Sequence, residues 1–128
     1  MTAPAFERGA PASGPLVRGY AEGGFIVDGE AWPAVLLTPE RATAWQAPPL
    51  AALTADDLAP LLALAPPPEF LILGTGAAMA FPPRALVRAL DERGIGIEAM
   101  DSRAAARTWG LLRAEERWIA AAIMALRP

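Results

Sequence analysis

The stretch FLILGTGAAMAFPPRALVRALDERGIGIEAMD, residues 70–101, decides the fold because it combines strand, glycine turn, helix and strand. Its first four residues, FLIL, are all apolar, which is typical of a strand covered on both faces of an α/β sheet. The segment IGIEAM, residues 95–100, predicts a second short strand. Two strands joined by one helix pair in parallel across a right-handed crossover. The sequence therefore predicts an α/β domain containing one βαβ unit.

The helix between these two strands carries both start and stop signals. Pro82 and Pro83 suit its first turn, where a missing amide costs little, and Gly94 suits its end. Apolar residues at helical spacing predict the face that packs on the sheet. The expected buried stripe consists of Leu86, Val87 and Leu90.

The turn Gly74-Thr75-Gly76 resembles the start of a dinucleotide-binding loop but departs from it. In such a loop the turn leads directly into a helix whose first amides meet a pyrophosphate. Here Met79 stands in place of the third glycine, and Pro82 follows Gly76 by six residues. We therefore expect no dinucleotide cofactor. The turn is either purely structural or cradles a small anion with the amides of residues 74–78.

Polar residues beyond the second strand are further candidates for a site. Asp101 suits the N-cap of the next helix, and it also suits a general base or ligand contact that faces the glycine turn. Arg107 is either an anion contact or, with Arg103 and the charged residues at 115–117, part of a surface ion-pair network. Both pairs of alternatives remain open.

Composition excludes several kinds of chemistry. The 128 residues include no His and no Cys, and all eleven basic residues are Arg. These absences exclude disulfides, zinc sites built from His or Cys, imidazole triads and Schiff bases. A net charge of −3 argues against a general nucleic-acid binder. We therefore expect no catalytic residue, no metal, no cofactor and no nucleic-acid partner.

The chain is expected to hold one domain at residues 16–128 after a flexible tail at residues 1–15. The tail lacks the apolar run of a secretory signal. The most apolar late run, residues 118–126, is far shorter than the ~20 residues that a helix needs to cross a bilayer. We expect a soluble, cytoplasmic protein that does not span the membrane.

The remaining elements follow from local patterns. Strands are expected near residues 16–20, 24–27 and 32–38, with Asp28-Gly29 as a two-residue hairpin turn. A connector places Trp45 over the core, and an exposed tryptophan would indicate a partner surface. A short helix, capped by Asp56 or Asp57, buries Leu58, Leu61 and Leu62. The segment after Asp101 is either one helix broken at Gly110 or a helix followed by a strand near residues 117–125, and periodicity does not separate these.

The carboxyl half resembles a family of small α/β domains, mostly uncharacterised in bacteria and archaea, that includes a mitochondrial complex I (NADH:ubiquinone oxidoreductase) assembly factor. The resemblance extends forward to GYAEGGFIVDG, residues 19–29, and so covers nearly all of the chain after the tail. The residues that carry it most specifically are Met100-Asp101, Ala104-Ala105, Arg107-Thr108-Trp109, Leu112 and Glu115-Glu116-Arg117.

This resemblance implies three layers around a mixed, partly parallel sheet, with the run after Arg117 as a last strand antiparallel to the rest. It implies protein partners, possible respiratory complex subunits among them, and no established reaction. The chain departs from the family's usual Thr at Ser102 and Tyr at Trp109. The leading hypothesis is a protein-binding or assembly module. The alternative is a small-molecule or anion binder, an enzyme included, whose site consists of Gly74, Thr75, Gly76, Asp101, Arg107 and Thr108.

Overall fold

The computed structural model describes residues 14–21 and 24–127, which form two β-sheets, three α-helices and two short 3-10 helices. An antiparallel sheet holds β1 (Val17–Ala21), β2 (Gly24–Val27) and β3 (Glu30–Trp32). The larger sheet has the order β5-β4-β8-β6-β7. Its strands are β4 (Val35–Leu37), β5 (Ala42–Ala44), β6 (Phe70–Gly74), β7 (Gly96–Met100) and β8 (Ala120–Ile123). The helical elements are η1 (Leu50–Ala52), η2 (Ala55–Leu58), α1 (Ala59–Leu62), α2 (Arg84–Asp91) and α3 (Ser102–Ala114).

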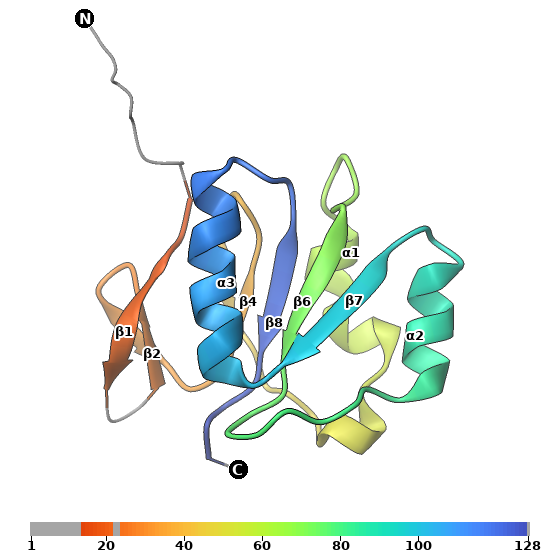
Figure 1. Ribbon diagram of the computed structural model, residues 1–128, viewed down its shortest axis with the longest axis horizontal. Coiled ribbons are helices and arrows are strands. Elements are labelled where there is room, and N and C mark those ends of the chain that lie inside the picture. The colour runs from red at the N-terminus through yellow and green to blue at the C-terminus, as the bar shows by residue number, and fades with distance from the viewer. Residues whose placement is uncertain (1–13, 22–23, 128) are drawn as a thin grey trace, which may run out of the picture.

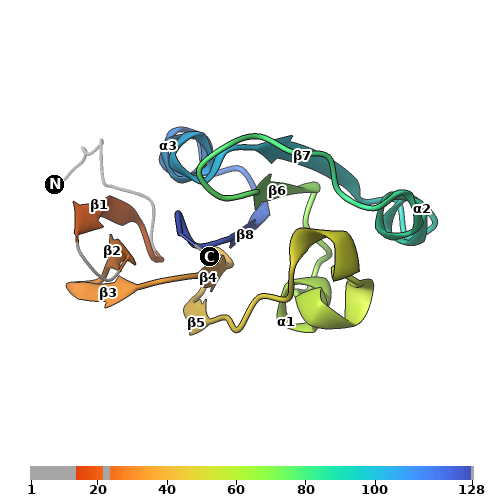
Figure 2. The same ribbon diagram turned by 90° about the horizontal axis from the view of Figure 1, so that it is seen from below.

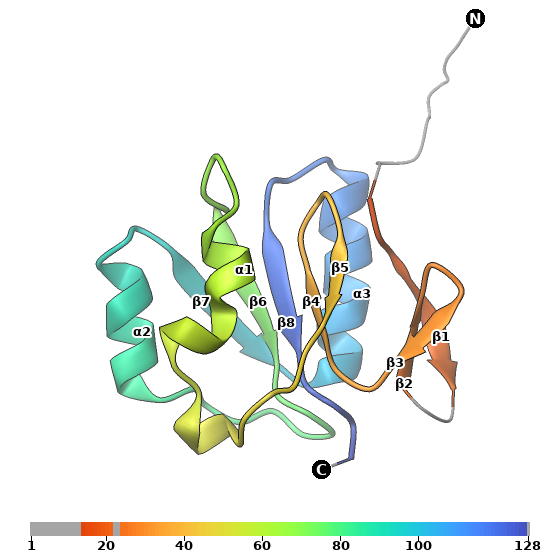
Figure 3. The ribbon, with the colours of Figure 1, turned by 180° about the vertical axis from the view of Figure 1, so that it is seen from behind.

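The elements form three layers, as the resemblance implies. Figure 1 shows α3 in front of the larger sheet, beside the small β1-β2-β3 sheet. Figure 3, seen from behind, shows α1 and α2 on the opposite side, and Figure 2 shows the larger sheet between the layers. The expected mixed α/β fold is therefore confirmed.

Strand β6 contributes to a separate core on each face of the sheet. Leu71 and Leu73 pack into the core on the α1 and α2 side, while Ile72 packs into the core under α3. This alternation follows from the period of two along a strand. The interpretation of FLIL as a strand covered on both faces is confirmed.

The strand connections correct two predictions. Strand β6 is parallel to β7, as expected, but it is also parallel to β8 on its other side. Helix α3 therefore forms a second parallel connection, from β7 to β8, which the prediction of a single βαβ unit missed. The last strand is antiparallel to β4 alone, not to the rest of the sheet. At 13 residues, α3 rises about 20 Å, enough to carry the chain back along the sheet.

The amino-terminal strands are partly as expected. Val27 pairs with Glu30 across Asp28-Gly29, whose φ angles of 52° and 82° confirm the two-residue hairpin turn. The strand expected at 32–38 is divided between β3 and β4, which lie in different sheets. Pro33 follows β3 directly, and because it lacks an amide it cannot continue the ladder.

Three smaller expectations are corrected. The connector contains a strand, β5, which pairs with β4. The N-cap of η2 is Thr54, with Asp57 completing the capping box from the third helical position. Val87 is 42% exposed, so the buried stripe of α2 consists of Leu86 and Leu90.

The expected tail falls mostly outside the described residues, which begin at Gly14. Of its last two residues, Pro15 is buried and its carbonyl accepts a 2.9 Å hydrogen bond from the indole of Trp109. The domain therefore holds the chain from Pro15 onward, and the flexibility of the preceding residues stays a prediction.

Candidate functional site

The glycine turn after β6 is held by hydrogen bonds within the protein. The Thr75 N–H donates to the Met100 carbonyl at 2.8 Å, and the Gly76 N–H donates to the Ser102 hydroxyl at 2.8 Å. Gly76 has a φ of 104°, a conformation that favours glycine. Two of the amides expected to cradle an anion are therefore already bonded to the protein itself.

The Thr75 side chain also bonds within the turn. Its hydroxyl lies 2.7 Å from the Ala78 carbonyl, to which it donates, and it accepts from the Ala80 N–H at 3.0 Å. This pattern tightens the loop before α2 into a compact turn. The late start of α2, at Arg84, agrees with the departure from a dinucleotide-binding loop seen in the sequence.

Ser102 is the residue that joins this corner of the molecule, a role that the sequence analysis did not predict. Its side chain is fully buried. The hydroxyl accepts from the Gly76 N–H and donates to the Met124 carbonyl at 2.7 Å, while the Ser102 N–H donates to the Gly76 carbonyl at 2.8 Å. It therefore ties the start of α3 to the segments after β6 and β8. The family's usual threonine at this position, which carries the same hydroxyl, is the signal that could have identified it.

Gly74 lets α3 approach the end of β6 closely. A Cβ atom on Gly74 would lie 2.9 Å from the Ser102 hydroxyl and 3.0 Å from both the Ser102 Cα and the Ala105 Cβ. Real Cβ atoms do not approach another atom as closely as 2.9 Å, and contacts of 3.0 Å are tighter than most, so an added side chain would require Ser102 and α3 to shift away from β6.

The position of this corner within the sheet is the usual one for ligands in α/β proteins. The chain leaves β6 toward β7 on one side and returns to β8 on the other, so the strand order reverses between β6 and β8. Open α/β sheets bind ligands outside the carboxyl ends of strands at such a point. Here the Ser102 hydroxyl bonds to the segments that follow both strands.

Asp101 is confirmed as the N-cap of α3. Its carboxylate accepts from the Ala104 N–H at 2.9 Å. The positive end of the helix dipole is thus met by a carboxylate of the chain itself. A further role for Asp101 toward a ligand stays a prediction.

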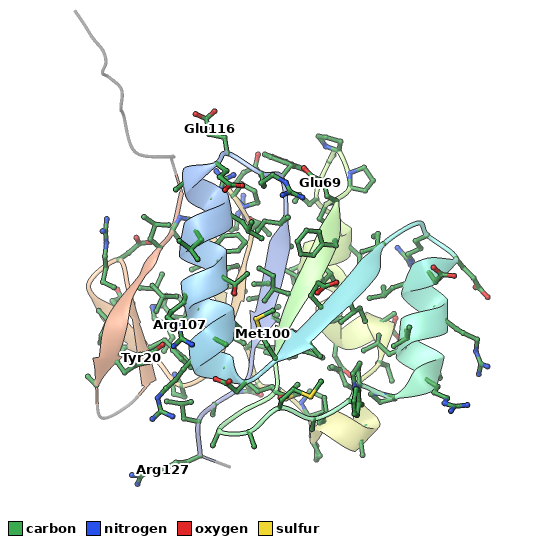
Figure 4. All side chains as sticks on the ribbon, viewed as in Figure 1. Tyr20, Glu69, Met100, Arg107, Glu116 and Arg127 are labelled. Carbon is green, nitrogen blue, oxygen red and sulfur yellow. The ribbon has the colours of Figure 1, made fainter. Side chains whose placement is uncertain are left out.

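Arg107 and Thr108 lie further along α3 than the other predicted site residues. Arg107 follows Ser102 by five positions, or about 7.5 Å along the helix axis. Figure 4 shows its side chain on the side of α3 that faces β1, near Tyr20. The structure thus brings Gly74, Thr75, Gly76 and Asp101 together and leaves Arg107 and Thr108 on the helix beyond them.

An open groove of about 800 Å³ lies beside the glycine turn, with Ala77, Tyr20, Arg103 and Arg127 among its lining residues. The Tyr20 hydroxyl donates to the Arg103 carbonyl at 3.1 Å, and the Arg103 guanidinium lies 5.7 Å from the centre of the Tyr20 ring. That distance is within the range of a cation–π contact. The groove therefore combines an aromatic wall with two guanidinium groups, a composition that suits an anionic ligand.

A second exposed feature lies where the loop after the glycine turn enters α2. Phe81 is 82% exposed, and Met79 and Val87 are also exposed. A hollow of about 540 Å³ is lined by Phe81, Pro82, Val87, Arg84 and Arg88, which we call the Phe81 surface. Soluble proteins bury most large aromatic side chains, so a bare phenylalanine marks a region suited to binding.

No tryptophan provides such a surface. Trp45 and Trp109 are buried and Trp32 and Trp118 are half-buried. Trp45 packs in the core, as the sequence predicts. The indole N–H groups of the other three donate to backbone carbonyls.

The ion pair that the described residues form differs from the expected network on α3. Arg117 pairs with Glu69 at 2.8 Å, across the gap between the start of β6 and the end of α3. The hydrogen bond from Arg117 lowers the pKa of the exposed Glu69 carboxyl. Figure 4 shows Glu69 at the opposite end of the sheet from Met100, so this pair lies away from the glycine turn.

The pattern of a family described as a protein of unknown function (DUF498/DUF598) matches residues 17–124. The chain belongs to this family. An uncharacterised protein of Rhodobacter capsulatus is 33% identical over 109 residues, covering 84% of this chain and 82% of that protein. The Danio rerio protein named NADH dehydrogenase [ubiquinone] 1 alpha subcomplex assembly factor 3 is 29% identical over 115 residues, covering 88% of this chain and 66% of that protein.

A solved structure agrees with the fold. The solution structure of a Bordetella pertussis protein, described as an Mth938-like domain, superposes with a TM-score of 0.74 at 28% identity and covers 98% of this chain and 91% of that one. Within residues 14–21 and 24–127, no helix has the length and apolar character required to span a membrane.

Proposed function

We propose that the protein is a protein-binding assembly module whose partners include subunits of a respiratory complex. The observation that carries this proposal is the Phe81 surface, where a phenylalanine is 82% exposed. A folded protein gains little by exposing such a ring to water, whereas burying it against a partner is favourable. The name of the Danio rerio relative supports assembly as the role and NADH dehydrogenase as the target.

The hydrogen bonds of the glycine turn also support a binding module over an enzyme. The Thr75 and Gly76 amides and the Ser102 hydroxyl are bonded within the protein. We interpret the turn as part of the scaffold. A cytoplasmic location, as the sequence predicts, is part of this proposal.

The test is affinity capture of the tagged protein from gently solubilised membranes and cytosol of its own cells, followed by mass spectrometry. We expect respiratory complex subunits to be recovered with the wild type and with Thr75→Ala, and to be lost with Phe81→Ser. Leu111→Ser is the matched control, because Leu111 is 69% exposed on α3. Failure of the wild type to recover any such subunit would contradict the proposed function.

The groove beside the glycine turn favours a second candidate, an anion-binding protein. Arg103 and Arg127 both line it. A ligand bound there would raise the melting temperature by mass action. A thermal-shift screen of anionic metabolites would support this candidate if the shift of the wild type disappeared in Arg103→Ala and Arg127→Ala, and would oppose it if no anion shifted the wild type.

A further inference from the structure

The two charged residues that line the hollow at Phe81, Arg84 and Arg88, are both basic. Arg84 and Arg88 are one helical turn apart, so they share a face of α2, and both are exposed. Across residues 14–21 and 24–127, neither guanidinium forms an ion pair with a carboxylate. The exposed Val87 lies beside them and lines the same hollow. The Phe81 surface therefore combines an apolar centre with two arginines that form no ion pair with a described carboxylate.

The start of α2 adds to this positive character. Its first turn contains Arg84 and no acidic residue, and its N-cap, Pro83, provides no side-chain acceptor. The first turn of α2 thus supplies no carboxylate of its own to the positive end of the helix dipole. Asp91 lies about 10 Å along the axis from Arg84 but only three positions after Arg88, with which it forms no ion pair among the described residues. This local charge is opposite in sign to the net charge of −3 on the whole chain.

The residue types at this surface match those that protein interfaces favour. Aromatic residues, methionine and arginine are enriched in interfaces. Phe81 supplies the aromatic type from the loop, and Arg84 and Arg88 supply arginine from α2. An apolar centre with charged groups at its rim is also the usual arrangement of an interface.

We infer that the Phe81 surface docks an acidic, amphipathic segment of a partner protein, with apolar side chains against Phe81 and Val87 and carboxylates against Arg84 and Arg88. This inference rests on the proposed function and specifies the partner's chemistry. The rim charges determine which partners are accepted, because a basic segment would place like charges together.

The first experiment replaces Phe81 by the photo-cross-linking residue p-benzoylphenylalanine in the full chain, expressed in its own cells. The matched control places the same residue at Leu111. After irradiation, mass spectrometry identifies the cross-linked segment. We expect position 81 to capture a partner segment in which apolar residues alternate with an excess of Asp and Glu.

The outcomes separate the inference from the proposed function. Capture of a basic or uncharged segment, or of a second copy of this chain, at position 81 would overturn the inference. Capture of a respiratory subunit at position 111 but not at 81 would overturn it too, while leaving the proposed function in place. If neither cross-linking position captures a partner and affinity capture with the wild type recovers none, the inference and the proposed function both fail.

The second experiment measures the affinity of the captured segment, synthesised as a fluorescent peptide, for the full chain by anisotropy. The double variant Arg84→Glu with Arg88→Glu should weaken binding by about tenfold or more, and Phe81→Ser by about 30-fold. The control is Arg18→Glu with Arg41→Glu, which reverses two exposed arginines elsewhere and should change binding little. Unchanged or stronger binding by the Arg84 and Arg88 double variant would overturn the inference.

Discussion

Two neighbouring regions of the chain differ in how many of their side chains and backbone groups already have a partner within the protein. In the glycine turn, Gly76 and Ser102 exchange hydrogen bonds, and Gly74 has no room for a side chain. Five residues after Gly76, Phe81 lies 82% exposed beside arginines without an ion-pair partner among the described residues. The glycine turn, which is the stretch most similar to a known ligand motif, therefore stabilises the fold. The loop at Phe81, which matches no motif, has groups available for binding.

The difference has a simple physical basis. Buried polar groups must be paired, because leaving one unpaired costs about 1–3 kcal/mol. The corner between β6, β8 and α3 is buried, so the protein pairs its groups internally. The Phe81 surface faces solvent, where charged groups are stabilised by water and remain available to a partner.

The largest expected effect comes from Gly74→Ala, which we expect to destabilise the fold by about 3 kcal/mol, because its Cβ would meet the Ser102 backbone. Urea denaturation measures this. Gly96→Ala on β7 is the matched control, since its Cβ would have no atom within 4 Å, and it should change stability by less than about 0.5 kcal/mol. If Gly74→Ala and Gly96→Ala lowered the free energy of unfolding equally, the close packing of α3 on Gly74 would not be what stabilises the glycine turn.

Ser102→Ala should cost about 2 kcal/mol, since it leaves the Gly76 N–H and the Met124 carbonyl without their buried partner. Thermal unfolding followed by circular dichroism checks this. Ser102→Thr keeps the hydroxyl and should lose less. A near-neutral Ser102→Ala would show that the corner is less tightly joined than its hydrogen bonds indicate.

Asp101→Ala should cost about 1 kcal/mol through loss of the cap of α3, and Asp101→Asn only a few tenths, because an amide oxygen still accepts from the Ala104 N–H. The free energies of unfolding of both variants measure the difference. A variant that keeps its stability but loses a specific ligand or partner would assign Asp101 a binding role. The corner at the glycine turn would then take part in binding as well as in stability.

The smallest expected effect on stability is that of Phe81→Ser, within about 0.5 kcal/mol of the wild type, as for a surface substitution. Leu111→Ser should behave alike, since both side chains are largely exposed. Chemical denaturation of the two variants tests this. A loss above about 1 kcal/mol for Phe81→Ser alone would show that the ring stabilises the fold and would remove the contrast between the two regions.

Much of the fold could be predicted because its signals are local. The apolar run of β6, the Asp28-Gly29 turn and the prolines before α2 each constrain their own segment. The resemblance supplied the strand β8, which periodicity had left open. The division of β3 from β4 was missed because it depends on which sheet each segment joins, and local propensity carries little of that information.

The candidate site was less predictable. Gly74, Thr75, Gly76 and Asp101 do lie together, as expected from adjacent strand ends. Ser102 was missed as the joining residue because its partner carbonyl, on Met124, directly follows β8, a strand whose neighbours were unknown. Phe81 was missed because an aromatic residue in a loop is as compatible with burial as with exposure.

By itself, the sequence determined most of the element types, the Asp28-Gly29 turn and the absence of His, Cys and Lys chemistry, since these depend on nearby residues or on composition. The tertiary structure alone decided that β8 lies beside β6, that the Thr75 and Gly76 amides are bonded within the protein and that Phe81 is exposed. The physical reason is separation along the chain. The bond between Gly76 and Ser102 joins residues 26 positions apart, and no local pattern reports whether a donor has found so distant a partner.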